Sequence, residues 1–120
     1  EVLMKNILPL TKALADKNRL MIVFALMRHE ELCACQLIEL LQVSGATSSR
    51  HLSILVNANL IESRKDGRWV YYRLSKNIHD DLCGWLRSAM AESVEFKAIG
   101  DRLDQILSLA VETICKKQRC

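Results

Sequence analysis

Apolar residues recur every three or four positions through the first half of the chain, which is the spacing of amphipathic helices. Asp16 stands where an N-cap of the second helix is expected, and Pro9 is expected to kink the first helix. A turn around Val43–Gly45 separates the third helix from the fourth. The predicted helices cover about residues 3–14, 17–29, 33–41 and 46–57.

The period of the pattern changes after residue 59. Residues 60–65 have the character of a strand, and Asp66-Gly67 is a tight-turn signal. Residues 68–74 are rich in aromatic and β-branched side chains, which favours a second strand. The two strands are predicted to form a β-hairpin.

The remainder of the chain is predicted to be helical, over about residues 77–116. Gly84 and Gly100 weaken this region, so we expect one bent helix or two. With one proline and four glycines the chain shows no linker, repeat or low-complexity tract, which predicts a single domain over residues 1–120. No apolar run approaches the roughly 20 residues of a membrane span, and no leader is recognisable, so we expect a cytoplasmic protein with no membrane partner.

Helix, turn, helix and hairpin follow one another in the order of a winged helix-turn-helix. The expected fold class is therefore mainly α with a small β-hairpin, with the recognition helix at about residues 46–57 and the wing at about residues 60–74. Residues 44–76 hold six basic and two acidic side chains, a net charge of +4, whereas the rest holds eleven basic and twelve acidic ones, a net −1. Double-stranded DNA is the natural partner of this asymmetry.

Small polar residues open the predicted recognition helix, where bulky side chains would hold the backbone away from the major groove. Hydroxyls contact phosphates or bases, arginine suits guanine or phosphate, and a cationic hairpin tip reaches the minor groove or the flanking backbone. For the hydroxyl residues the structural alternative is helix capping, for Arg50 an ion pair, and for His51 packing. The expected DNA-binding residues are Ser44, Thr47, Ser48, Ser49, Arg50, His51, Lys65 and Arg68.

Three segments resemble the arsenical-resistance repressor (ArsR/SmtB) family: Glu31–Cys35 (ELCAC), Ser49–Leu52 (SRHL) and Arg64–Leu74 (RKDGRWVYYRL). The resemblance covers residues 14–75, and the long helices predicted on either side are of the type that the family has. It implies a homodimeric winged-helix transcription repressor whose terminal helices form the dimer interface. It also implies that an inducer releases the repressor from its operator DNA.

Cys33 and Cys35 are the candidate metal-binding residues. Two positions on a regular helix lie about 200° apart, so these sulfurs share a ligand only if the helix starts irregularly or unwinds at its first turn. A soft ion, which thiolates select, would then distort the helix directly before the recognition helix. The resemblance implies arsenite or antimonite, As(III) or Sb(III), as the inducer, held by three sulfurs. Simple burial of both cysteines is the structural alternative.

The third sulfur is missing from its family position, because the Cys-x-Cys-x-x-Cys motif places its last residue at Ile38 here. The replacements that we consider are Cys115 or Cys120 of the same or the partner chain, Cys83, and a cellular thiol. The family's zinc-type site on the last helix is judged absent, since residues 101–112 contain no histidine. No obligatory cofactor is expected.

Other functions are weighed against this one. Cys115 and Cys120 enclose the sequence KKQR, whose cations would make both thiols reactive. This pair is a candidate for an independent thiophilic site or for the redox pair of a redox-responsive repressor, and a frayed tail is the structural alternative. A cadmium- or lead-responsive repressor ranks lower, because the family's sensors of those ions use further cysteines in an N-terminal arm and none precedes Cys33. Five cysteines, an odd number, argue against a disulfide framework. A thiol oxidoreductase is disfavoured because Cys-Ala-Cys lacks a βαβ context, and a protein-interaction module without DNA is the remaining class.

Overall fold

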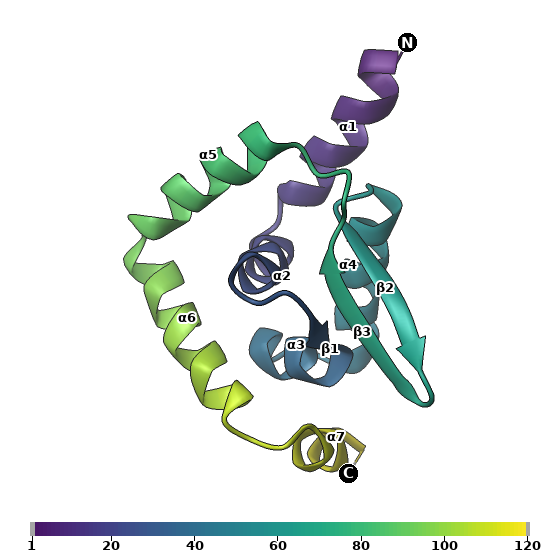
Figure 1. Ribbon diagram of the computed structural model, residues 1–120, viewed down its shortest axis with the longest axis vertical. Coiled ribbons are helices and arrows are strands. Elements are labelled where there is room, and N and C mark those ends of the chain that lie inside the picture. Colours follow the sequence, from purple (N-terminus) through teal and green to yellow (C-terminus); the bar gives the residue numbers. More distant parts are fainter. Residues whose placement is uncertain (1, 120) are drawn as a thin grey trace.

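The computed structural model describes the backbone of residues 2–119 and the side chains of residues 7–116 and 118. Within that part of the chain helices predominate, and a small sheet interrupts them, so the mainly α prediction is confirmed (Figure 1). The elements in order are α1 (Val2–Leu14), α2 (Lys17–Arg28), β1 (Leu32–Cys33), α3 (Ala34–Leu41), α4 (Gly45–Asn57), β2 (Ile61–Asp66), β3 (Trp69–Leu74), α5 (Asp80–Ala91), α6 (Val94–Leu107) and α7 (Val111–Arg119).

Helix α2 is the centre of the core. Six consecutive residues from Met21 to Leu26 are buried, as expected of a helix that is apolar all round and has neighbours on every side. It packs against α1, α3, α4, α5, α6 and β3. Asp16 caps its start as predicted, because Oδ1 accepts hydrogen bonds from the N–H groups of Asn18 (2.8 Å) and Arg19 (3.2 Å).

A short turn joins α3 to α4. Gln42 ends α3 with a φ of 58°, in the left-handed region that commonly terminates a helix. Ser44 then caps α4, which begins at Gly45, one residue before the predicted start. The predicted turn at Val43–Gly45 is therefore confirmed to within a residue.

The hairpin forms as predicted, with Asp66 opposite Trp69 across the antiparallel pair. Gly67 takes a φ of 62° in the turn, a conformation that glycine adopts without strain. A third strand was not predicted: β1 pairs with the other edge of β3, where Cys33 faces Tyr71. The third helix consequently begins at Ala34, not Cys33. A two-residue strand is too short to show a periodic pattern in the sequence. Strand β1 exists because it pairs with β3.

The C-terminal region contains three helices where one bent helix or two were predicted. Neither glycine marks a break, since Gly84 lies within α5 and Gly100 within α6. The first break comes at Ser93, whose Oγ accepts a hydrogen bond from the N–H of Phe96 (3.2 Å) and caps α6. A Cβ at position 100 would lie 3.5 Å from the Phe24 ring, an ordinary van der Waals contact, so Gly100 marks where α6 packs on α2.

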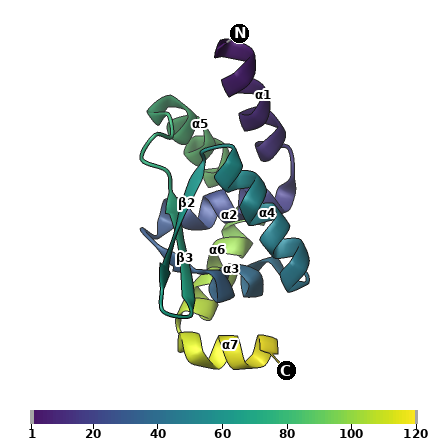
Figure 2. The ribbon, with the colours of Figure 1, turned by 90° about the vertical axis from the view of Figure 1, so that its right-hand side faces the viewer.

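Helices α5, α6 and α7 form an arc around α2 and α3 (Figure 1). The arc starts near α1 at one end of the molecule and finishes with α7 beside α3 at the other. Because α4 and β2 run in opposite directions, the start of α4 and the tip of the hairpin point toward the same end (Figure 2). In the described part of the chain, no helix is long and apolar enough to cross a membrane.

Candidate DNA-binding surface and cysteine site

Ser44 builds the first turn of α4. Its Oγ accepts a hydrogen bond from the N–H of Thr47 (3.1 Å), which caps the helix, and donates to Thr47 Oγ1 (3.0 Å). The Ser44 hydroxyl thus has the capping role that was its structural alternative. Gly45 and Ala46 follow and are small and exposed, so the backbone at this end of α4 is open to a partner.

Ser48 and His51 face the core. Ser48 is 0% exposed and His51 7%, because both lie on the side of α4 that carries its buried residues. The Nδ1 of His51 is 3.1 Å from a terminal nitrogen of Arg19. Since a guanidinium only donates, Nδ1 is the acceptor of this hydrogen bond. The structure therefore corrects the prediction that these two side chains face DNA.

The opposite face of α4 carries Ser49 and Arg50, which are both exposed, while Thr47 beside them is half-buried. Ser53 and Asn57 are also exposed, one and two turns beyond Ser49. Sequence reasoning missed these two residues, although the helical step of about 100° places positions 49, 53 and 57 on one side. The outer face of α4 is therefore a polar stripe longer than predicted.

Lys65 lies near the end of β2 and Arg68 lies in the hairpin turn, and both are exposed. The guanidinium of Arg68 lies 4.8 Å from the ring centre of Trp69, a cation–π contact that orients the side chain. The hairpin tip that carries both cations points toward the same end of the molecule as the start of α4 (Figure 2). The outer face of α4 and this wing tip together form the candidate DNA-binding surface.

Arg64, a third cation of the wing, is paired within the protein. It donates to both carboxylate oxygens of Glu31 (2.7 and 2.6 Å), and its guanidinium lies 4.6 Å from the ring centre of Tyr71. The hydrogen bond from Arg64 holds the pKa of Glu31 below its usual value, and Glu31 raises the pKa of Arg64. Because the folded-state pKa of Glu31 is lowered, the pair stabilises the fold above the ordinary carboxyl pKa and loses that contribution as the pH falls.

Cys33 and Cys35 lie on either side of the junction between β1 and α3. Cys33 is 1% exposed and has an extended backbone, and its N–H donates to Gln36 Oε1 (2.8 Å). Cys35 is in the first turn of α3 and partly buried. The helix thus starts between the two cysteines, so they do not both lie on a regular helix.

Cys35 forms a disulfide with Cys115 of α7, 80 residues away in sequence, with the Cα atoms 5.7 Å apart. Gln118 adds to this contact, since its Nε2 donates to the backbone oxygen of Cys35 (2.7 Å). Ile114 and Cys115 are buried, so α7 is packed onto α3 as well as bonded to it. The odd number of cysteines therefore did not exclude a disulfide, because the folding back of α7 brings these two distant residues together.

The other candidates for the third sulfur differ in position. Cys83 lies on α5, at the other end of the arc from α7 (Figure 1), and burial raises the pKa of its thiol. Cys120 lies outside the described residues, and Cys115, its partner in the redox prediction, is paired with Cys35 instead. Among the described residues, no three His, Cys, Asp or Glu side chains are grouped closely enough to hold a metal ion.

Known proteins match this chain in sequence. The family model described as "Bacterial regulatory protein, arsR family" matches residues 16–63, from the cap of α2 into β2. The chain is 46% identical over 67 residues to the cadmium resistance regulator CadC of Listeria innocua, covering 56% of each chain. It is similar to the arsenical resistance operon repressors of Escherichia coli (48% over 69 residues, 58% of this chain and 59% of the relative) and Bacillus subtilis (39% over 77 residues, 60% and 73%). It thus spans little more than half the length of the first two.

Solved structures share the fold. HlyU from Vibrio cholerae aligns with a TM-score of 0.62 and 28% identity, covering 72% of this chain and 90% of that one. A homodimeric winged helix-turn-helix DNA-binding domain from Mycobacterium bovis aligns with a TM-score of 0.63 and 24% identity, covering 75% and 80%. These likenesses confirm the winged helix-turn-helix that the order of elements predicted.

Proposed function

The chain belongs to the arsR family of bacterial regulatory proteins, and on that premise we propose that it is a dimeric repressor that leaves its operator when arsenite or antimonite binds Cys33, Cys35 and Cys115. The contact between Cys35 and Cys115 carries the proposal. It joins a further sulfur to Cys35, and because the three sulfurs are not grouped as a metal site among the described residues, a ligand has to draw Cys33 toward the other two. Cys115 thereby replaces the family cysteine whose position Ile38 occupies.

The candidate DNA-binding surface supplies the operator contacts. Ser49 and Arg50 project near the start of α4, the part of a recognition helix that meets base edges, and arginine suits guanine or phosphate. Lys65 and Arg68 neutralise the phosphates beside the groove. Thr47 contributes at the rim of this surface.

Three sulfurs suit a trivalent metalloid, because thiolate is the ligand that soft ions select. The cysteines bind in their reduced form, so the disulfide first takes up two electrons and two protons, either from two thiols that become a disulfide or from a phosphine and water that become the phosphine oxide. Each of the three thiols then gives up one proton, and the three hydroxyls of arsenite leave as water. Three new sulfur–metalloid bonds replace three bonds to oxygen.

The three cysteines belong to three different elements. Cys33 lies in β1, which pairs with β3 of the wing, Cys35 on α3, which leads into α4, and Cys115 on α7. A ligand that draws their sulfurs together acts on all three elements at once. The resulting shift at the β1–α3 junction moves α4 relative to the wing and weakens operator binding.

Dimerisation is proposed through the terminal helices. Ile7 and Leu8 of α1 and Trp85 of α5 are exposed large apolar side chains, Trp85 to 66%. Trp85 lines an apolar hollow formed by α1, α2, α5 and α6. The solved domain from Mycobacterium bovis is homodimeric, and a two-fold dimer presents two recognition helices to two half-sites.

Fluorescence anisotropy tests the metalloid proposal. The probe is a labelled DNA duplex selected for binding by this protein, and a phosphine keeps the cysteines reduced. Arsenite is expected to weaken operator binding by about 5- to 150-fold, the usual range of allosteric coupling. Cys33→Ser, Cys35→Ser and Cys115→Ser should each abolish most of this response. Cys83→Ser is the matched control and should respond as the unmodified protein does.

The result that would overturn the metalloid site is unchanged release by arsenite when Cys35→Ser and Cys115→Ser are combined. Cd²⁺ is titrated in parallel, because CadC of Listeria innocua, a cadmium resistance regulator, is among the relatives. Release by Cd²⁺ and not by arsenite would assign the same sulfurs to a divalent soft ion.

A redox response is the second candidate function, and the Cys35–Cys115 disulfide favours it. In this scheme the two thiols give two electrons and two protons to hydrogen peroxide, which becomes two waters as the disulfide forms. Operator affinity would then differ between oxidised and reduced protein with no metalloid present. Equal affinity of the two forms would remove this function.

A further inference from the structure

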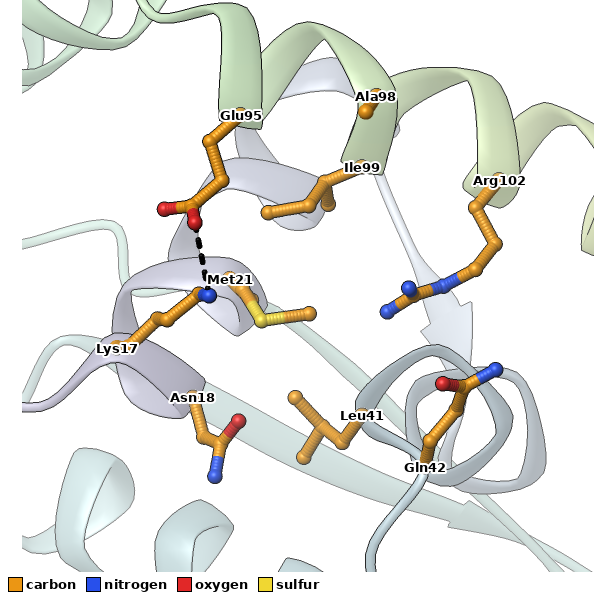
Figure 3. Close-up of a pocket in the computed structure, with 9 residues that line it drawn as sticks. All are labelled: Lys17, Asn18, Met21, Leu41, Gln42, Glu95, Ala98, Ile99 and Arg102. Carbon is orange, nitrogen blue, oxygen red and sulfur yellow. Dashed lines mark hydrogen bonds and ion pairs between the residues drawn. The ribbon is translucent and has the colours of Figure 1, made fainter.

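A cavity of about 360 Å³ lies between α2, the end of α3 and α6 (Figure 3). This volume is at the lower end of the range of small-molecule sites. The cavity contains none of the cysteines and none of the residues of the candidate DNA-binding surface. Its lining residues are Lys17, Asn18, Met21, Leu41, Gln42, Glu95, Ala98, Ile99 and Arg102.

The inner part of the cavity is apolar and its mouth is polar. Met21, Leu41 and Ile99 are buried and form the apolar part. The side-chain amides of Asn18 and Gln42 stand at the edge (Figure 3). An occupant that matches this arrangement has an apolar body and a polar head.

Arg102 indicates that the polar head of the occupant is negatively charged. Its guanidinium is directed from α6 into the space between Met21 and Leu41 (Figure 3). One terminal nitrogen donates to the backbone oxygen of Leu40, whereas the buried Nε–H has no hydrogen-bond partner among the described residues. An unpaired buried donor on a cation is costly, and the planar fork of arginine matches a carboxylate.

The other charges at the cavity leave it net positive. Two lining residues are basic, Lys17 and Arg102, and one is acidic, Glu95. Glu95 pairs with Lys17 at 3.0 Å, and both side chains are 60% exposed, so water screens this ion pair and an incoming anion can compete for Lys17. The N-terminal amides of α2 do not supply the positive field, because Asp16 already accepts their hydrogen bonds.

We propose that this cavity binds a small organic carboxylate with an apolar body, held by Arg102, and that the bound acid modulates operator binding. The cavity adjoins the helix-turn-helix, since Arg102 holds the last turn of α3 through Leu40 and Gln42 is the left-handed residue that starts the turn to α4. A ligand there bears directly on the position of the recognition helix. The binding site is independent of the metalloid proposal.

The binding test uses hexanoate and benzoate as probes, with hexanamide and benzamide as neutral counterparts, and follows backbone amide shifts of the full chain by NMR. Each acid is expected to give saturable shifts at Leu41, Gln42 and Ile99. It should bind at least about tenfold more tightly than its amide, the worth of a charged hydrogen bond. Inorganic phosphate, which lacks an apolar body, should bind more weakly than either acid.

Three variants locate the binding. Arg102→Gln removes the fork and should weaken both acids by about tenfold or more, while Lys97→Gln, which removes an exposed cation of the same helix, should leave binding unchanged. Ala98→Leu fills part of the cavity without changing its charge and should also weaken binding, which keeps the test decisive if Arg102→Gln fails to fold. Equal binding of acid and amide, no saturable shifts with either acid, or unchanged binding in both cavity variants would overturn the site.

The regulatory part is measured separately. Saturating benzoate should change operator affinity in the unmodified protein and in Cys35→Ser with Cys115→Ser, but not in Arg102→Gln. An operator affinity that benzoate leaves unchanged would overturn the effector role. Because no metalloid is present, failure of the arsenite experiment and failure of this one are distinguishable.

Discussion

At the scale of single residues, direction on the helix decides what a side chain of α4 does. Ser48 and Ser49 are neighbours of the same type, yet the first is fully buried and the second exposed. The Oγ of Ser48 has no hydrogen-bond partner among the described residues. The helical step of about 100° separates the two residues, so one packs against the core and the other is open to solvent.

Ser48→Ala removes a buried, unpaired hydroxyl, so we expect thermal stability at a fixed protein concentration to be unchanged or to rise by up to about 1 kcal/mol. Operator affinity should stay the same. Arg50→Ala on the outer face should instead cost about 1–3 kcal/mol of operator binding. Thermal denaturation and anisotropy measure the two effects. A loss of affinity in Ser48→Ala as large as that in Arg50→Ala would contradict the assignment of the two faces.

At the scale of elements, the wing divides its cations between the protein and the solvent. Arg64 is committed to Glu31, which precedes β1 and thereby ties the wing to the strand that carries Cys33. Lys65 and Arg68 are exposed at the tip. The net charge of the segment therefore overstates the number of cations that are available to DNA.

Salt dependence of operator binding separates these two groups of cations. Lys65→Ala and Arg68→Ala should each lower the slope of log affinity against log salt by about 0.9, the value for one phosphate contact. The matched control is Arg64→Ala combined with Glu31→Ala, which removes the ion pair without changing the net charge and should leave the slope unchanged. A slope that falls in the control, and not in the tip variants, would place Arg64 on the phosphates instead.

At the scale of the whole molecule, the arc of α5, α6 and α7 connects the proposed dimer interface at one end of the molecule with the proposed sulfur site at the other. Its first helix, α5, exposes Trp85 near α1, and its last helix, α7, is bonded to α3 through Cys115. Helix α6 lies between them and forms one wall of the carboxylate cavity. The proposed dimer interface, acid site and sulfur site are therefore arranged along one continuous stretch of chain.

Trp85→Asp places a charge in the proposed dimer interface, so we expect it to shift the protein from dimer to monomer and to weaken operator binding. Sedimentation equilibrium at several concentrations measures the first effect. Leu109→Asp is the matched control, because Leu109 is also an exposed large apolar residue but lies after α6, away from α1. A Trp85→Asp protein that remains dimeric, or a Leu109→Asp protein that dissociates, would refute an interface at α1 and α5.

The sequence by itself determined the features that depend on near neighbours. Helical periodicity, the Asp16 cap and the Asp66-Gly67 turn act within a few residues, so pattern alone located the first four helices and the hairpin. The order of those elements and the family segments then indicated a winged-helix regulator. The cysteine pair at Cys33 and Cys35 was also visible, since its two residues lie close together in the chain.

Only the tertiary structure decided which distant segments meet. The partner of Cys35 is 80 residues away, β1 exists through its pairing with β3, and the cavity around Arg102 has three walls from three helices. The burial of Ser48 likewise depends on what α4 packs against. Such contacts arise from packing between elements. The entropy cost of closing a loop rises only slowly with its length, so the distance between two residues in the sequence says almost nothing about whether they meet.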